Sequence, residues 1–218
     1  FAPWAFWVDE FLEIGGHDYL YRPQSKEDDD IWNRFLLNGT KFIQTREGYC
    51  YHMTCRGSRF NPFLTTPGKN SEEWETHNVK STRNHIRKWG SWIKHTQFGL
   101  PILKPKYAIG FKIKNCDSAL LYHLEPWCSS HCSVQFETSK NLDTQFIHNY
   151  IRDEQPNTKF DLEKKLIFDW GDMEPEIVVE IDRHTFGEIE WSYIQHLSQI
   201  IETSGEIGQF ELGNLKIR

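Results

Sequence analysis

Four consecutive carboxylates, Glu27 to Asp30, are the main chemical signal of this sequence. They stand directly before apolar residues at helical spacing, from Ile31 to Leu36, and Gly39 is the predicted end of that helix. One or two acids suffice to cap a helix or to interact with its dipole, at about 0.3–1 kcal/mol each. Because adjacent like charges repel, the run of four indicates a second role. A carboxylate at a helix N-terminus can stay ionised and act as a general base.

The elements that must position these acids are predicted in the first half of the chain. Val8 to Ile14 reads as a short helix that stops at Gly15-Gly16, and a loop then leads to the acids. Further elements follow them. They are short strands at Lys41 to Gln44 and Gly48 to Met53, and a long polar helix from Asn70, with Glu73 completing a capping box, to about His95.

The second half alternates strand and helix patterns. Strands are predicted at 107–114, 133–137, 166–170, 176–181 and 209–217, and helices at 117–127, 144–152 and 185–203. This order indicates a small α+β domain, with a ferredoxin-like arrangement as one candidate.

Charge divides the chain at the same place. Residues 1–104 hold 14 Lys and Arg against 12 Asp and Glu, a net charge of +2, and residues 105–218 hold 11 against 19, a net charge of −8. A proline- and glycine-containing stretch, Gly99 to Pro105, lies at the boundary. We therefore expect two domains, 1–104 and 105–218.

Composition excludes several classes of protein. The net charge of −6 disfavours a nucleic-acid binder held by phosphate contacts. The mean hydropathy of −0.64, with no apolar run near ~18 residues, predicts no transmembrane segment. The sequence opens on Phe1 without a signal-peptide pattern, and its five cysteines cannot all pair, which mildly favours a cytoplasmic protein.

The acid run also resembles a known family. Glu27 to Arg34 is similar to the Glu-Asp-Asp-Asp-Ile-Phe-Asn-Arg motif of Golgi beta-galactosyltransferases, and more broadly to the Glu-Asp-x-Asp motif of family 2 glycosyltransferases with a GT-A fold. Ile14-Gly15-Gly16 precedes the acids at nearly the family's spacing, Tyr51-His52 resembles the family's histidine, and Lys88-Trp89-Gly90 resembles a common continuation. The resemblance covers roughly residues 1–90.

The resemblance implies a reaction and roles for individual residues. The reaction is inverting transfer of a sugar, a hexose in the resembling enzymes, from a nucleotide-sugar donor to a hydroxyl of a carbohydrate or glycoconjugate acceptor. Asp28 matches the catalytic base, and Glu27 and Asp29 match residues that bind sugar hydroxyls. Trp4 and Trp7 are candidate platforms for sugar rings, or else core residues.

A metal ion is also implied. His52 matches the ligand of a Mn²⁺ or Mg²⁺ ion that neutralises the leaving diphosphate. Without the resemblance, His52 is typical of a hydrogen-bonded strand residue. The metal-bound methionine that the family places three residues earlier is Tyr49 here.

The sequence departs from the family in two further respects. Gln24-Ser25-Lys26 stands where the galactosyl subset has Trp-Gly-Gly, and no Asp-x-Asp motif precedes the acids. The resemblance therefore implies that the nucleotide-binding N-terminal half of the catalytic domain is missing from these 218 residues. As given, the chain should transfer little or no sugar, and residues 105–218 form an accessory domain.

Three alternatives remain open at this point. In the first, the protein is a non-enzymatic carbohydrate- or protein-binding module, and the acids only cap a helix. In the second, a His/Cys cluster is either a zinc site or the packed end of a helix; its members are His123, Cys128, His131 and Cys132. In the third, the basic residues between Lys80 and His95 either form a solvated helix face or attract a diphosphate.

Overall fold

The computed structural model describes residues 4–48, 59, 70–92, 100–129, 132–135, 144–167, 175–205 and 208–218. The chain divides into two compact units. Unit 1 comprises Phe1–His85 and Ile93–Ile102, and unit 2 comprises Ile86–Trp92 and Leu103–Arg218. The last change of unit, after Ile102, lies close to the predicted seam at 104/105. None of the helices in the described ranges is long and apolar enough to cross a membrane.

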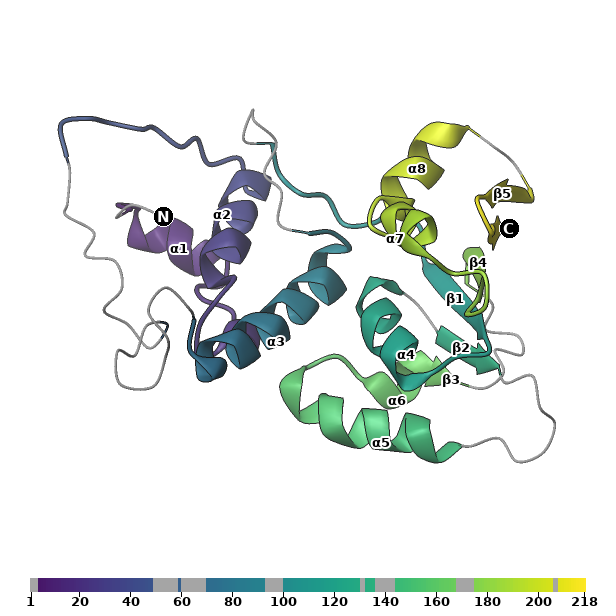
Figure 1. The fold of residues 1–218 in the computed structure, drawn as a ribbon. Helices are drawn as coiled ribbons and strands as arrows, with labels where there is room; N and C mark the ends of the chain where they lie inside the picture. The colour runs from purple at the N-terminus through teal and green to yellow at the C-terminus, as the bar shows by residue number, and fades with distance from the viewer. Residues whose placement is uncertain are drawn as a thin grey trace. The chain divides into compact units, whose positions relative to one another are not determined.

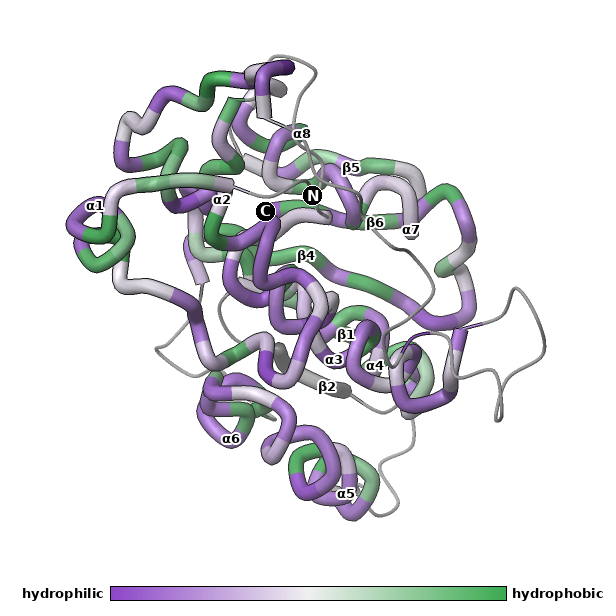
Figure 2. The backbone as a smooth tube through the Cα atoms, turned by 90° about the vertical axis from the view of Figure 1, so that its left-hand side faces the viewer, coloured by the Kyte–Doolittle hydropathy of each residue, from purple (hydrophilic) through white to green (hydrophobic). Residues whose placement is uncertain are grey.

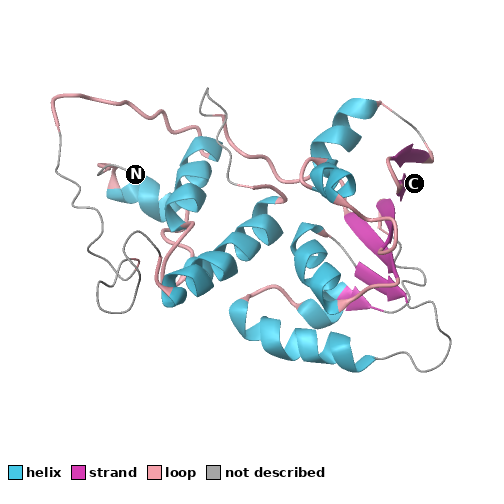
Figure 3. Ribbon diagram, in the orientation of Figure 1, coloured by secondary structure: helices cyan, strands magenta, loops and turns pink. Residues whose placement is uncertain are grey.

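Unit 1 is helical in its described part, as Figure 3 shows. Its elements are α1 (Val8–Glu13), the 3-10 helix η1 (Tyr19–Tyr21), α2 (Glu27–Leu37) and the first part of α3 (Glu72–Trp89). The predicted stop at Gly39 is confirmed, because α2 ends just before it and Gly39 has a left-handed φ of 85°. The strand predicted at Lys41 to Gln44 is wrong, because these residues lie outside any helix or strand. Most of the strand predicted at 48–53 falls outside the described residues.

The start and end of α3 differ from the prediction. The side chain of Ser71, rather than that of Asn70, accepts a hydrogen bond from the backbone N–H of Trp74 at 3.1 Å. The helix ends at Trp89, and Gly90 follows with a φ of 67°. A Cβ on Gly90 would lie 2.4 Å from Cγ of Pro105, so this turn requires glycine.

A small core holds unit 1 together. Leu20, Tyr21, Ile31 and Phe35 are buried around α2. Asn33 of the same helix is also fully buried, and its amide satisfies both backbone groups of Ile102: it accepts from the N–H at 2.6 Å and donates to the carbonyl at 3.1 Å. A buried polar side chain thereby fixes the segment that closes unit 1.

Unit 2 is built on a six-stranded mixed sheet (Figure 1). The strand order is β3-β2-β1-β4-β6-β5, with parallel pairing from β3 to β4 and antiparallel pairing of β6 with both neighbours. The strands are β1 (Ile109–Lys114), β2 (Cys132–Gln135), β3 (Leu166–Ile167), β4 (Ile177–Asp182), β5 (Phe210–Leu212) and β6 (Leu215–Ile217). This is a mixed α/β arrangement, and it does not confirm the ferredoxin-like expectation.

The helices of unit 2 follow the predicted positions with breaks. They are α4 (Ser118–Leu124) with η2 (Glu125–Trp127), α5 (Thr144–Glu154) with η3 (Gln155–Asn157), α6 (Leu162–Lys165), α7 (Glu188–Ile194) and α8 (Leu197–Ser204). The single helix predicted over 185–203 is thus two helices separated by a turn at 195–196. The single strand predicted over 209–217 is a hairpin that turns at Gly213, whose φ is 62°.

The sheet of unit 2 has one apolar and one charged face. Ile109, Phe111 and Ile113 of β1 are buried, and they pack in one core with residues of α4, α5, α7 and α8. Lys112 and Lys114, which alternate with these residues along β1, point to the other face. There Nζ of Lys114 lies 3.6 Å from Glu180 of β4. β4 is accordingly coloured mostly as hydrophobic and turns hydrophilic toward its charged end (Figure 2).

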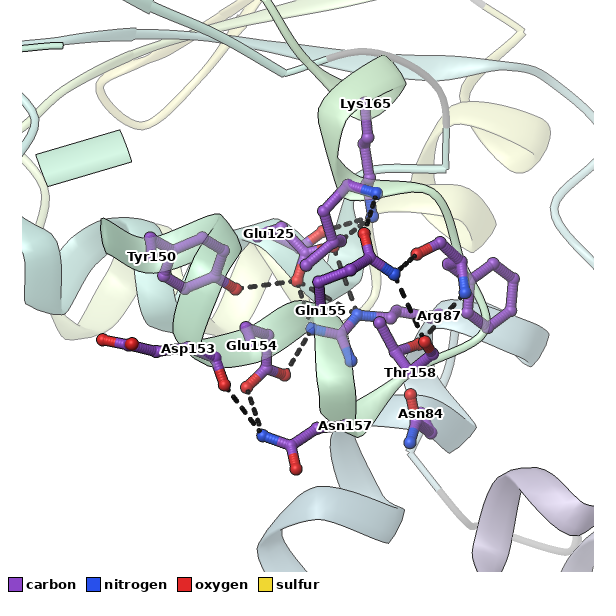
Figure 4. Close-up of polar contacts among 12 residues, drawn as sticks. Asn84, Arg87, Glu125, Tyr150, Asp153, Glu154, Gln155, Asn157, Thr158 and Lys165 are labelled. Atoms are coloured by element: carbon purple, nitrogen blue, oxygen red, sulfur yellow. Dashed lines mark hydrogen bonds and ion pairs between the residues drawn. The ribbon is translucent and has the colours of Figure 1, made fainter. Parts of the chain in front are cut away.

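A buried network of charges joins the helical layer of unit 2 (Figure 4). Arg87 of α3 donates at 2.6 Å both to Glu125 of η2 and to Glu154 of α5. Lys165 of α6 and the hydroxyl of Tyr150 also donate to Glu125, at 2.7 Å and 2.9 Å. Burial alone would raise the pKa of Glu125, but the charges of Lys165 and Arg87 hold it well below its usual range. In these ion pairs, the two cations Arg87 and Lys165 balance the charges of the two carboxylates Glu125 and Glu154.

Replacing Glu125 tests this network. Glu125→Gln removes one of the two carboxylates that balance Arg87 and Lys165, and we expect the free energy of unfolding to fall by about 3–5 kcal/mol. Urea titration at neutral pH measures the loss. Asp153→Asn, which affects an exposed pair with Arg152, is the matched control and should leave the midpoint unchanged.

The same variant has a predicted pH signature. A carboxyl whose folded pKa is depressed stabilises the protein above the ordinary glutamate value of 4.5, and this contribution is lost as pH falls below that value. The difference in stability between the parent protein and Glu125→Gln should therefore shrink as the titration is repeated from pH 6 toward pH 3. A constant difference would contradict the assignment.

Candidate functional site

The four acids occupy the first turn of α2, but none of them is the N-cap. That position is held by Lys26, whose side chain makes no capping hydrogen bond and whose backbone is left-handed, with a φ of 71°. The acids therefore do not act as the side-chain cap that a structural interpretation of the run requires. They retain the favourable interaction with the helix dipole.

Each acid has a different environment. Asp30 is completely buried, Glu27 and Asp29 are partly buried, and Asp28 is exposed. Glu27 carries a carboxylate oxygen, Oε2, that is shielded from solvent and has no hydrogen-bond partner. The run thus combines a buried structural carboxylate, Asp30, with an exposed carboxylate, Asp28, and with Glu27, one of whose oxygens has no hydrogen-bond partner.

Asp30 connects three segments of unit 1. Its Oδ1 accepts from the hydroxyl of Tyr21 at 3.2 Å, and its Oδ2 accepts from Nε of Arg34 at 2.8 Å. Arg34 also donates to the carbonyl of Ile14 at 2.6 Å. Burial, followed by the charge of Asp30, raises the pKa of Tyr21 well above its usual range, so the phenol stays a donor. Through Asp30, the end of α1 and the loop before the acids are fixed to α2.

The loop that enters the acid run has a strained backbone. Ser25 and Lys26 both have left-handed φ values, 78° and 71°, which cost roughly 1–3 kcal/mol each for residues other than glycine. α3 holds the loop in place, because the hydroxyl of Ser25 donates to Asn78 at 2.7 Å and that of Ser81 donates to the carbonyl of Gln24 at 3.0 Å. Such a conformation persists only where its surroundings determine it, and such sites are often functional.

His17 is a site residue that the sequence interpretation missed. Burial raises the pKa of Glu27, the neighbouring charges of Asp28 and Asp29 raise it further, and His17 is close enough to oppose the shift. His17 is exposed and its ring lies 5.5 Å from that of Phe11. Its position directly after Gly15-Gly16 was the available signal, since that turn brings it back toward α2.

The two predicted tryptophans differ in their surroundings. Trp4 is partly buried and packs edge-on against Trp32 of α2 at 5.6 Å and Phe42 at 6.3 Å. Trp7 stands just before α1, and 78% of its surface is exposed. Trp4 therefore contacts the helix that carries the acids through Trp32, while the ring of Trp7 is accessible to a ligand.

The predicted metal ligand His52 lies outside the described residues, so its position relative to the acids stays a prediction. Oxygen ligands such as Glu27, Asp28 and Asp29 suit Mg²⁺ or Mn²⁺. In the described ranges, however, no group of three or more His, Cys, Asp or Glu side chains could hold a metal ion. The described residues alone thus supply carboxylates without a complete set of ligands.

The zinc alternative is described only in part. Cys128 is buried in the core of unit 2, and its thiol lies 3.5 Å from the carbonyl of Ile109. His123 is exposed on α4 and packs against the rings of Tyr122 and Trp191. His131 and the side chain of Cys132 lie outside the description. Cys128 thus has the packing role of the structural alternative.

The basic stretch of α3 is not a uniform solvated face. Arg83, His85 and Arg87 are buried, and Arg87 belongs to the charge network of unit 2. Lys80 donates to the carbonyl of Arg22 at 3.1 Å in the loop before the acids. At least two of these cations are therefore used to hold the fold.

Comparisons of the chain with protein-family models, curated proteins and solved structures give no match.

The structural role of Asp30 is testable. Asp30→Ala leaves Tyr21 and Arg34 without their buried partner, and we expect the free energy of unfolding to fall by about 3 kcal/mol. Asp28→Ala is the control: Asp28 lies two residues earlier in the same turn of α2 and is exposed, so its replacement should change stability little. Urea titration of both variants makes the comparison, and an equal loss in the two would contradict the division of roles.

The raised pKa of Glu27 predicts an effect of opposite sign. Because the folded state favours protonated Glu27, ionising this side chain destabilises the protein once the pH rises above the ordinary value of 4.5. We expect Glu27→Gln to raise the thermal midpoint at pH 7.5 and to leave it unchanged at pH 4. Thermal melts at the two pH values measure this, and a lower midpoint at pH 7.5 would show that Glu27 stabilises the fold.

Proposed function

We propose that this chain carries the acceptor-side part of an inverting glycosyltransferase domain of GT-A type, with Asp28 as the general base. The observation that supports it most strongly is the loop before the acids. Ser25 and Lys26 adopt left-handed backbone conformations at the two positions where the resembling galactosyltransferases have Gly-Gly. The chain therefore retains a glycine-like backbone without the glycines, at a cost in strain.

The acids divide the proposed reaction among them. Asp28 is exposed on a fixed helical turn, so its carboxylate can accept the proton of an acceptor hydroxyl as the oxygen attacks the anomeric carbon. The bond from that carbon to the diphosphate breaks, and the nucleoside diphosphate leaves. Glu27 and Asp29, which are partly buried beside Asp28, would bind sugar hydroxyls, the role that the resemblance implies for them. Asp30 takes no part and holds the turn in place.

The remaining parts of the proposal concern groups outside the described site. His52 would be the metal ligand, and Mn²⁺ or Mg²⁺ would supply charge neutralisation of the diphosphate when bound. Trp7 is the better of the two tryptophans for stacking on a sugar ring, because Trp4 is packed on α2. The nucleotide-binding half would be supplied by polypeptide outside these 218 residues, and unit 2 would be an accessory domain.

The competing function is a non-enzymatic carbohydrate- or protein-binding module. The exposed rings of Trp7 and Tyr19, 78% and 85% accessible, favour it because exposed aromatic side chains commonly mark binding surfaces. It does not explain the partnerless Oε2 of the partly buried Glu27 or the strained loop.

An activity assay separates the two functions. A polypeptide that joins the natural upstream residues to this chain should transfer sugar from one of a panel of nucleotide-sugars in the presence of Mn²⁺. Asp28→Asn should lower kcat by about 10²–10⁴-fold, as expected for loss of a general base. Glu73→Gln, an exposed acid in the first turn of α3, is the matched control and should retain activity. Full transfer by Asp28→Asn, or efficient transfer by residues 1–218 alone, would refute the proposal.

A further inference from the structure

Positive charges border the loop of residues 22–26, which leads into the acid run. Arg22 and Lys26 stand at its two ends, as the residue that ends η1 and the residue that precedes α2. Lys80 of α3 lies against the same loop, because its ammonium group donates to the carbonyl of Arg22 at 3.1 Å. Three cations are thus placed beside the turn that carries Asp28, in a chain whose net charge is −6.

These cations keep charge and donors that the fold does not use. Arg22 is exposed and Lys26 is partly exposed, and among the described residues neither side chain forms an ion pair with a carboxylate. An ammonium group has three donors, and the carbonyl of Arg22 takes one of them from Lys80. The charges therefore remain available to an anionic ligand.

α3 presents a further polar group to the same loop. The hydroxyl of Ser81 donates to the carbonyl of Gln24, and His77 stands one helical turn before Ser81, so the two residues share the face of α3 toward the loop. Nδ1 of His77 is shielded from solvent and has no hydrogen-bond partner. An unpaired, shielded polar atom is unfavourable, and an oxygen of a ligand bound at the loop would pair with it.

The position of Lys26 relative to Asp28 identifies the part of the substrate that the cations contact. A general base must lie within hydrogen-bond distance of the hydroxyl that it deprotonates. Lys26 stands two residues before Asp28, so its long side chain reaches the same acceptor sugar. The acid run repels an anionic group on that sugar, and the cations of the loop offset the repulsion. A neutral sugar needs only the carboxylates and gains nothing from the cations.

We propose that the acceptor sugar of this site is anionic, and that Arg22, Lys26 and Lys80 bind its carboxylate or phosphate group while Asp28 faces its reacting hydroxyl. The inference rests on the proposed function, which supplies the acceptor and the base. Hydrogen bonds from ammonium and guanidinium groups to such oxygens are short and strong, so they would orient the sugar as well as select it.

Binding measurements on residues 1–218 test the charge preference without requiring catalysis. The probes are glucuronate and glucose 6-phosphate, with glucose as the neutral reference, and NMR titration gives the dissociation constants. We expect at least one anionic sugar to bind about 10-fold more tightly than glucose at low salt, and this preference to shrink as added salt screens the charges. The two anionic probes distinguish a carboxylate from a phosphate. Equal affinity for all three sugars, or no binding of either anionic sugar, would overturn the proposal.

Matched variants locate the anion site. Lys26→Gln and Lys80→Gln should each weaken binding of the anionic sugar by about 10-fold, because each removes one charge-assisted contact, and should leave the affinity for glucose unchanged. The unchanged affinity for glucose also shows that each variant is folded. Lys41→Gln, which removes the same charge from an exposed residue beyond the opposite end of α2, is the control and should bind like the parent. Equal weakening in all three variants, or in none, would contradict a site at this loop.

Three further outcomes separate this inference from the proposed function. Preference for the anionic sugar without any transfer in the activity assay would sustain the anion site and refute the glycosyltransferase. Transfer that depends on Asp28 but proceeds as fast to glucose as to glucuronate and glucose 6-phosphate would do the reverse. Binding of UDP that is lost in Lys80→Gln, with no preference among the sugars, would assign the cations to the donor diphosphate and overturn the anionic acceptor.

Discussion

A buried charge must be paired, and each unit of this protein is built around one carboxylate that meets this constraint. In unit 1 it is Asp30, which Tyr21 and Arg34 satisfy. In unit 2 it is Glu125, which Arg87, Lys165 and Tyr150 surround. Both carboxylates draw together elements that are distant in sequence, and neither has an oxygen left for a ligand. Removing one partner of such a pair leaves an uncompensated buried charge, so these contacts penalise arrangements of each unit that separate the partners.

The constraint on Asp30 explains how a run of four acids can serve two purposes. Once Asp30 is committed to the interior, the register of α2 determines where the preceding residues lie: Glu27 is partly shielded, and Asp28 faces solvent. The fold thus tolerates a partnerless oxygen on Glu27 and left-handed backbone at Ser25 and Lys26, because Asp30 and the hydrogen bonds from α3 over-determine the loop. Stability supplied at one position permits strain at its neighbours, which is the pattern expected where a site is maintained for a ligand rather than for folding.

Periodicity predicted the elements better than it predicted their partners. The helix at α2 was expected because its apolar residues recur at helical spacing, the helix at α3 because of its capping-box residues, and the stop at Gly39 because glycine adopts a left-handed φ readily. The order of the sheet could not be predicted, since parallel neighbours are joined through long crossovers. The basic residues between Lys80 and His95 were expected either to form a solvated helix face or to attract a diphosphate, because a single sequence does not show that Glu125 and Glu154 lie opposite Arg87. The proximity of His17 to Glu27 depends likewise on a turn whose direction only the fold shows.

The wrong strand at Lys41 to Gln44 follows from the same distinction. Its composition is that of a strand, with Phe42 and Ile43 on opposite sides, but a strand exists only where another backbone completes its hydrogen bonds. The residue types of Lys41 to Gln44 therefore favour a strand, but no described segment of unit 1 pairs with them. In the described part of unit 1, Phe42 stacks on Trp32 of α2, so ring packing rather than strand pairing positions this segment. A local pattern of residue types therefore predicts which side chain of the segment is seated, but not whether its backbone joins a sheet.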